Sequence, residues 1–143
     1  MKPLSILLAE DSPADARLIG EALEENRFFV ALHHVIDGVE ALRFLRREGL
    51  YADRELPDLI LLDLNMPRKD GREVLAEVEQ DPRLRRLPVV VLTTSGVEED
   101  LVRSTMDHAN AFLTKPVNCD EFMALIRRLG DFWLTAVKLP PHD

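Results

Sequence analysis

Five polar residues stand where runs of large apolar residues end. Glu10 and Asp11 follow "LSILLA", Asp63 follows "LILL", Thr93 lies at the end of "PVVVLTT", and Lys115 follows "AFLT". Three carboxylates that lie close together repel one another unless a cation or a bound proton offsets their charge. A hydroxyl and an ammonium can donate hydrogen bonds to an anionic group that is bound next to that cation. These residue types therefore indicate chemistry on an anion held beside a cation.

Asp63 sets the sharpest problem, because four large apolar residues precede it directly. An unpaired carboxylate is costly to bury. We therefore expect Asp63 to stand just past its strand, at an open edge of a sheet. Other strands should then deliver partners to the same edge.

Short apolar runs alternate with segments of helical periodicity along the whole chain. The pattern predicts strands at 4–9, 28–35, 59–62, 88–94 and 111–114, and helices at 12–26, 37–49, 71–80, 96–110 and about 118–137. Continuous apolar strands in βα units are typical of a parallel sheet covered by helices on both faces. We expect one doubly wound α/β domain over residues 1–143, with residues 130–143 as a C-terminal extension.

The order of the strands decides whether the polar residues meet. In open parallel sheets, ligands bind outside the carboxyl ends of the strands. With the order 2-1-3-4-5, the four strands that end in polar residues lie next to one another. The second strand falls at the edge and offers nothing comparable before Asp37.

The resulting cluster favours magnesium and a phosphoryl group. Oxygen donors without nearby histidine or cysteine favour a hard ion, and a site with few protein ligands suits Mg²⁺. Glu10, Asp11 and Asp63 are the candidate ligands. Lys115 and Thr93 are not needed to bind a metal and fit contacts to a phosphoryl group. Asp63, which lies between both sets, is the candidate nucleophile that would form an acyl phosphate.

Composition excludes several other classes. The 143-residue chain has a formal net charge of −8, whereas a general nucleic-acid binder would show a basic excess. The single cysteine, Cys119, cannot form an internal disulfide. No run is long enough for a signal peptide or a membrane span, so we expect a cytoplasmic protein without nucleic-acid or membrane partners.

Five motifs together resemble the receiver domain of two-component response regulators, the CheY-like superfamily. The motifs "LLAEDS", "DGVEAL", "PDLILLDLNMPRKDG", "LPVVVLTTSG" and "FLTKP" follow one another in the family's order and at its spacing. The resemblance covers nearly the whole chain and implies a flavodoxin-like fold. It also implies that Asp63 accepts a phosphoryl group from a phosphohistidine on a sensor histidine kinase, with Mg²⁺ as the cofactor.

The resemblance also implies roles for individual residues. Glu10 and Asp11 match the acidic pair that binds Mg²⁺, and the backbone carbonyl of Asn65 matches a further ligand. Thr93 matches the switch hydroxyl. Lys115 matches the phosphate-binding lysine, which usually precedes a cis bond to the following proline.

The output of such a receiver is a change of surface rather than a reaction. Phe112 matches the aromatic switch position, although its spacing alone indicates a core residue. Phosphate on Asp63 is expected to draw in Thr93 and Lys115 and to remodel the face formed by the fourth helix, the fifth strand and the fifth helix. Only slow loss of its own acyl phosphate is expected, so the chain is not predicted to be an enzyme.

Three stretches narrow the resemblance further. The stretches "LDLNMP", "LTTS" and "DFWLTAVKLP" are most similar to stand-alone single-domain regulators paired with bacterial phytochrome kinases. In the last of these, Phe132, Trp133 and Val137 extend an apolar stripe beyond what a five-stranded sheet needs to cover it. We expect a homodimer through this tail; a tail folded back over its own domain is the alternative.

Other functions fit the residues less well. A structural pseudo-receiver or a phosphate-sink binding module stays open as the alternative. An aspartyl-phosphate hydrolase needs a second acid two residues after the nucleophile, and Asn65 occupies that position. A nucleotide-binding protein of this fold would need a glycine-rich loop after the first strand, which is absent.

Overall fold

A computed structural model describes residues 3–24, 30–94, 103 and 109–128. Its centre is a five-stranded parallel sheet in the order β2-β1-β3-β4-β5. The strands are β1 (Leu4–Ala9), β2 (Val30–Val35), β3 (Leu59–Asp63), β4 (Val89–Thr93) and β5 (Ala111–Thr114). The predicted strand order is confirmed, and the second strand lies at an edge.

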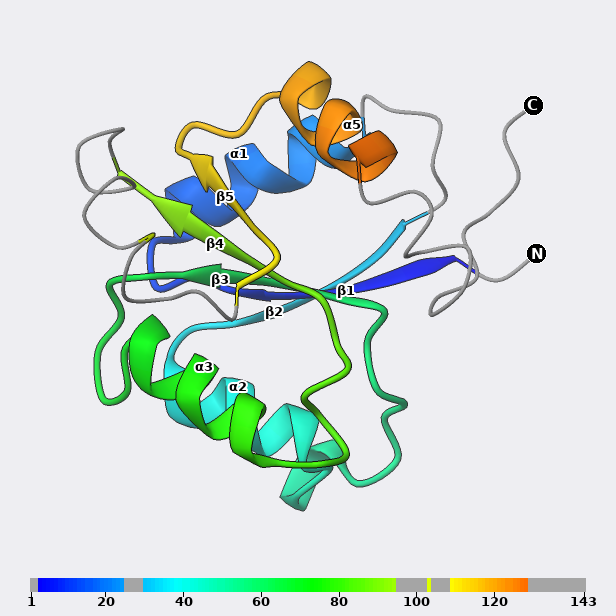
Figure 1. Ribbon diagram of the computed structural model, residues 1–143, viewed down its shortest axis with the longest axis vertical. Coiled ribbons are helices and arrows are strands. Elements are labelled where there is room, and N and C mark those ends of the chain that lie inside the picture. Colours follow the sequence, from blue (N-terminus) through cyan, green and yellow to red (C-terminus); the bar gives the residue numbers. More distant parts are fainter. Residues whose placement is uncertain (1–2, 25–29, 95–102, 104–108, 129–143) are drawn as a thin grey trace.

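Helices cover both faces of the sheet (Figure 1). One face carries α1 (Pro13–Glu24) and α5 (Cys119–Arg128), and the other carries α2 (Gly38–Leu45) and α3 (Gly71–Gln80). A short 3-10 helix, Gly49–Tyr51, follows α2. No helix in the described part of the chain is both long and apolar enough to cross a membrane. Of the helix predicted over 96–110, only residues 103, 109 and 110 are described, and the stripe of Phe132, Trp133 and Val137 lies outside the described residues.

The core consists of two layers, one on each side of the sheet. Successive residues of β1 alternate between them: Leu4, Ile6 and Leu8 pack beneath α1 and α5, whereas Leu7 and Ala9 pack beneath α2 and α3. Because both faces are covered, β3 and β4 are buried along their whole length. Each fully buried leucine contributes about 1.5–3 kcal/mol of hydrophobic stabilisation. The central strands therefore form a rigid base for whatever stands at their carboxyl ends.

Polar caps fix where the helices begin. The Ser12 hydroxyl accepts a hydrogen bond from the Asp15 backbone N–H (3.2 Å) at the start of α1. Asp37 caps α2, and Asp70 caps α3 in a reciprocal capping box with Glu73. These helices therefore begin where the sequence pattern predicts.

The predicted end of α2 at Gly49 is wrong, because the helix ends at Leu45. Arg47 takes the left-handed conformation there, with φ of 57°. The Arg47 N–H bonds to the Phe44 carbonyl (3.1 Å) and the Glu48 N–H to the Arg43 carbonyl (3.0 Å). This pattern is a Schellman motif, which usually places glycine at that position. The left-handed conformation costs arginine about 1–2 kcal/mol. The two hydrogen bonds of the motif, which satisfy carbonyls at the helix end, offset this cost.

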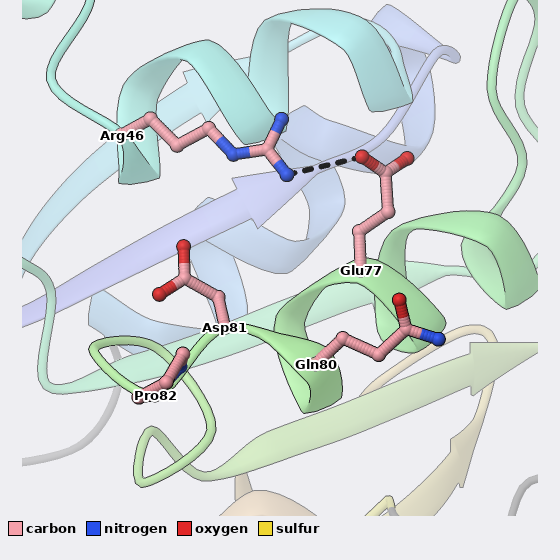
Figure 2. A pocket seen from close by; sticks show the side chains of 5 residues that line it. All are labelled: Arg46, Glu77, Gln80, Asp81 and Pro82. Carbon is pink, nitrogen blue, oxygen red and sulfur yellow. Dashed lines mark hydrogen bonds and ion pairs between the residues drawn. The ribbon is translucent and has the colours of Figure 1, made fainter.

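An ion pair joins α2 to α3 near their carboxyl ends (Figure 2). Arg46 Nη2 lies 3.0 Å from Glu77 Oε1, and Lys69 also pairs with Glu77. Hydrogen bonds from Lys69 and Arg46 hold the pKa of Glu77 below its usual value, although partial burial opposes them. A polar hollow beside this pair is lined by Arg46, Glu77, Gln80, Asp81 and Pro82. Because these helices run antiparallel to the strands, the hollow faces away from the strands' carboxyl ends.

Candidate functional site

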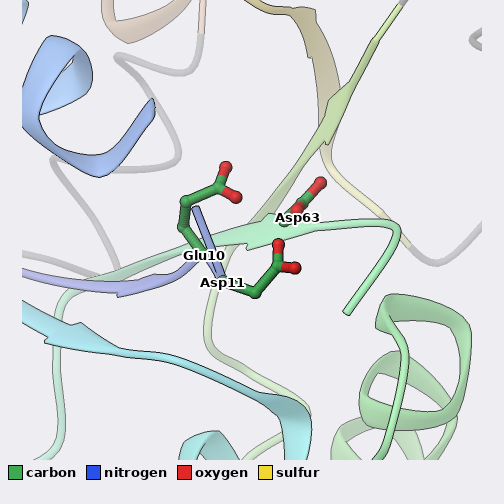
Figure 3. A group of neighbouring side chains, drawn as sticks. All are labelled: Glu10, Asp11 and Asp63. Atoms are coloured by element: carbon green, nitrogen blue, oxygen red, sulfur yellow. The ribbon is translucent and has the colours of Figure 1, made fainter. Parts of the chain in front are cut away.

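Three carboxylates meet at the carboxyl edge of the sheet (Figure 3). One ligand oxygen from each of Glu10, Asp11 and Asp63 lies within 4.8 Å of the others. Glu10 and Asp11 directly follow β1, and Asp63 is the last residue of β3 rather than the first beyond it. The adjacency of β1 and β3 brings together acids that stand more than fifty positions apart in the sequence.

Burial of the three acids is uneven. Glu10 is fully buried and Asp63 is 2% exposed, whereas Asp11 is exposed. The group therefore has a protein wall on one side and opens to solvent at Asp11. A small ligand entering from solvent would reach the carboxylates from that side.

Lys115 reaches this group from the end of β5. Its ammonium lies 2.9 Å from Glu10 Oε1, 3.0 Å from Asp15 Oδ2 and 3.5 Å from Asp63 Oδ1. Burial favours the neutral amine, but hydrogen bonds to Glu10 and Asp15 and the charge of Asp63 raise the pKa of Lys115 above its usual value. The lysine is therefore charged, and its peptide bond to Pro116 is cis, as predicted.

Asp63 is short of partners. Its Oδ1 makes no hydrogen bond, although it lies within ion-pair distance of Lys115. Burial, a hydrogen bond with Glu10 and the charge of Glu10 raise the pKa of Asp63 to about 7. Lys115 and a backbone hydrogen bond from Asn65 act in the opposite direction but do not outweigh these effects. In metal-free protein, one ammonium does not balance the negative charge of the group.

This imbalance fits a divalent cation. All donors are oxygens, the set has few protein ligands, and one buried carboxylate oxygen has no hydrogen-bond donor. A cation there would lower the cost of ionising Asp63 beside Glu10. Glu10, Asp11 and Asp63 could supply three ligands, and water or a phosphate oxygen would supply the others.

The predicted switch residues lie on β4 and β5, the two strands beyond β3 in the sheet. Thr93 is the buried last residue of β4, next to β3. Its hydroxyl donates a long hydrogen bond (3.5 Å) to the Leu113 carbonyl, which would be easily exchanged. Phe112 is buried in the layer beneath α2 and α3, and the Arg103 guanidinium lies 4.9 Å from its ring centroid. Phe112 is therefore a core residue, and its switching role stays a prediction.

The edge strand β2 supplies contacts that sequence reasoning missed. The Glu10 N–H donates to the Val35 carbonyl (3.0 Å), and His34 Nε2 lies 2.7 Å from the Glu10 carbonyl oxygen. Both backbone groups of a candidate ligand are thus held by a strand that seemed to contribute nothing. No local pattern signals this role, because His34 and Glu10 are 24 positions apart.

Comparison with known proteins gives one consistent family. The family model described as the response regulator receiver domain matches residues 6–127. The response regulator Rcp1 from Synechocystis sp. is 48% identical over 138 residues, which cover 96% of this chain and 94% of Rcp1. A Mn²⁺-bound structure of Rcp1 covers 97% of this chain and 100% of its own, with 47% identity and a TM-score of 0.73.

Two further solved structures are also similar over almost the whole chain. The phosphorylated cyanobacterial phytochrome response regulator RcpA is 47% identical, with a TM-score of 0.75, and the match covers 98% of this chain and 100% of RcpA. The bacteriophytochrome response regulator RtBRR is 42% identical, with a TM-score of 0.85, and the match covers 98% of this chain and 86% of RtBRR.

Proposed function

This chain belongs to the response regulator receiver domain family, and from that premise we propose that Asp63 is its phosphoacceptor. One observation carries the assignment. Asp63 is a buried carboxylate at a strand end, with two further carboxylates beside it and an ammonium 3.5 Å away. The chain is thus a phosphoacceptor module of a two-component system, and we propose residues 1–143 as one receiver domain with 130–143 as an extension.

Phosphoryl transfer to Asp63 needs a nucleophilic oxygen and positive charge that offsets the repulsion between the carboxylates and the incoming phosphoryl group. A carboxylate oxygen of Asp63 attacks the phosphorus of a phosphohistidine, the P–N bond breaks, and its electron pair leaves with the imidazole. Lys115 would contact the phosphoryl oxygens, a role supported by the 3.5 Å between its ammonium and Asp63 Oδ1. The product is an acyl phosphate that hydrolyses slowly, so the chain acts as an acceptor rather than as a turnover enzyme.

Mg²⁺ is the cofactor that fits this chemistry. Glu10, Asp11 and Asp63 would hold it, together with the backbone carbonyl of Asn65. When bound, it would offset the charge of the acids and of the incoming phosphoryl group. The Mn²⁺-bound structure of Rcp1 supports a divalent site in this family.

Phosphorylation is proposed to act through a two-state switch. The new charge on Asp63 would attract the Thr93 hydroxyl and Lys115, and Thr93 gives up only a long hydrogen bond in moving. Movement at the end of β4 would change the packing of Phe112 and the face that includes β5 and α5. Amide chemical shifts on β5 that stay unchanged with a phosphate mimic would contradict this switch.

The proposed partners are a kinase and a second copy of the chain. RcpA and RtBRR are phytochrome response regulators, which supports a histidine kinase of the bacterial phytochrome type as the phosphoryl donor. We propose a homodimer through the tail that contains Phe132, Trp133 and Val137. Gel filtration with light scattering tests this, and a monomer at high micromolar concentration with and without phosphorylation would contradict it.

Intact-protein mass after incubation with acetyl phosphate tests the phosphoacceptor. Wild-type protein should gain one phosphoryl group only when Mg²⁺ is present, and Asp63→Asn should gain none. Asp53→Asn is the matched control, because Asp53 is exposed and lies outside the acidic group. A gain by Asp63→Asn equal to that of wild type would assign the phosphate elsewhere. No gain by any variant would favour the pseudo-receiver alternative.

A further inference from the structure

The loop that leaves the phosphoacceptor strand is anchored at both ends. The Leu64 N–H bonds to the Leu92 carbonyl (3.1 Å), and the Gly71 N–H bonds back to the Leu64 carbonyl (2.8 Å). A Cβ on Gly71 would lie 2.6 Å from the Asp63 carbonyl oxygen, so only glycine allows this close return. Residues 65–70 form the excursion between these anchors, and this loop contains Asn65.

One side chain in this loop reaches across to another element. Arg68 Nε donates to Asp37 Oδ2 (2.8 Å), and its Nη2 donates to Asp37 Oδ1 (3.2 Å). This two-point geometry matches a planar guanidinium to a carboxylate and fixes orientation as well as distance. Arg68 itself has φ of 64°, which a non-glycine residue rarely adopts. The backbone is therefore held in an unusual conformation at the point where the side chain is anchored.

The other half of the contact is rigid. Asp37 is buried, and its Oδ1 also accepts the Glu40 N–H (2.8 Å) as the cap of α2. Burial raises the pKa of Asp37, but hydrogen bonds from Arg68 and the backbone N–H groups of Glu40 and Val39 outweigh it and lower the pKa overall. Asp37 is thus an ionised group fixed to a helix end, not a mobile surface acid.

Backbone contact reinforces the link between loop and helix. A Cβ on Gly38 would lie 2.1 Å from the Lys69 carbonyl oxygen, so the start of α2 touches the loop directly. The loop is thus held at Arg68 and Lys69 by the corner between β2 and α2. This corner is the part of the sheet edge that lacked any evident role.

We propose that the Asp37–Arg68 pair is a positioning clamp that sets the Asn65 backbone for cation binding beside Asp63. The proposal rests on the proposed function, because it concerns the same cation site. Asn65 already bonds to the Asp63 carboxylate through its backbone, so a shift of the loop would be felt at the acids. Mg²⁺ tolerates little departure from octahedral geometry. A ligand carbonyl three residues from the clamp therefore needs a fixed loop.

Simple electrostatics predicts the opposite sign, which makes the proposal testable. Removing a positive charge near a cation site should tighten cation binding, whereas loss of a positioning contact should weaken it. Arg68→Ala removes both the positive charge and the contact with Asp37. We expect the loss of the contact to have the larger effect, so the variant should bind the cation about tenfold more weakly. Arg68→Lys keeps the charge but loses the two-point geometry, so it should also weaken binding.

Titration with Mn²⁺, followed by water-proton relaxation, measures this directly without any phosphoryl donor. Arg72→Ala is the matched control, because Arg72 is exposed on the next helix and removes the same charge. It should bind Mn²⁺ as tightly as wild type or slightly more tightly. Arg68→Gly removes the side chain but adopts the positive φ without strain. If it also binds Mn²⁺ weakly, the loss comes from the missing Asp37–Arg68 pair and not from backbone strain in Arg68→Ala.

A second measurement guards against simple unfolding. In metal-free protein, amide hydrogen exchange of Asn65, Met66, Lys69 and residue 68 should rise about tenfold in Arg68→Ala, while exchange in β3 stays unchanged. Arg68→Ala that binds Mn²⁺ as tightly as wild type would overturn the clamp and leave the proposed function intact. Wild-type protein that binds no Mn²⁺ would overturn the cation site itself, and the clamp with it.

Discussion

Two aspartates mark the two ends of strand β3, and their surroundings differ completely. Asp58, before the strand, accepts the Ser5 N–H (2.8 Å), while its own N–H bonds to the Ser5 carbonyl (2.7 Å). Asp63, at the other end, has an oxygen without any hydrogen bond and two acids beside it. Asp58 at the amino edge is therefore paired, whereas Asp63 at the carboxyl edge belongs to a group with an excess of negative charge.

The same contrast recurs one strand further along. At the amino edge, Asn110 Oδ1 accepts the Val89 N–H (2.8 Å), and the Asn110 N–H bonds to the Val89 carbonyl (2.8 Å). At the carboxyl edge, the adjoining Thr93 hydroxyl has a long bond of 3.5 Å. Polar residues that are fully satisfied stabilise the fold, whereas those left short of partners are available for a ligand. Chemistry is therefore expected at only one of the two edges.

The largest effect should come from Lys115, the cation that holds the carboxyl edge together. Lys115→Met leaves Glu10 and Asp63 buried without it, and should lower the free energy of unfolding by about 3–5 kcal/mol at pH 8 without metal. Lys69→Met, which breaks a partly exposed pair with Glu77, should cost about 1 kcal/mol or less. Urea unfolding measures both losses. Equal losses of unfolding free energy would show that Lys115 contributes no more to stability than a lysine in a partly exposed ion pair.

Asp63→Asn should stabilise metal-free protein, because it removes the repulsion at this edge. The folded-state pKa of about 7 lies above the ordinary 3.8, so the native state binds the extra proton. The contribution of Asp63 to stability should therefore fall as pH rises from about 4 to 7 and level off above. The variant should be more stable by up to about 4 kcal/mol at pH 8, with little difference below pH 4.

Urea unfolding in the presence of a chelator, at several pH values, tests this expectation. Added Mg²⁺ should make wild type more stable than Asp63→Asn. The ion stabilises wild type by binding to it, whereas the variant lacks one of the ligands. A stability difference that does not change between pH 4 and pH 8 would mean that Asp63 is ionised in the folded protein without penalty.

The smallest effect should come from the amino edge. Asp58→Ala leaves the Ser5 N–H without its side-chain acceptor and should cost about 1 kcal/mol of unfolding free energy. Mn²⁺ binding and acetyl phosphate labelling should be unchanged, because the opposite end of the strand is untouched. A loss of labelling in a variant that is still folded would show that the two edges are coupled.

Most of the fold was predictable because its signals are local. Apolar runs identify the strands, and Ser12 lies where the first helix begins. The end of α2 was missed because Arg47 occupies a left-handed position where glycine is the usual signal, so the pattern extended the helix to Gly49. The residue type at position 47 gives no sign of the left-handed conformation, so the sequence pattern could not predict it.

The sequence by itself determined which residues gather: Glu10, Asp11, Asp63, Thr93 and Lys115 each stand at the end of a strand or directly after it, and parallel strands deliver their ends to one edge. Only the tertiary structure decided how they are held. Lys115 pairs with Glu10 across 105 positions, and Arg68 pairs with Asp37 across 31. The physical reason is that periodicity encodes which way a side chain faces, whereas the partner it meets depends on how distant segments pack.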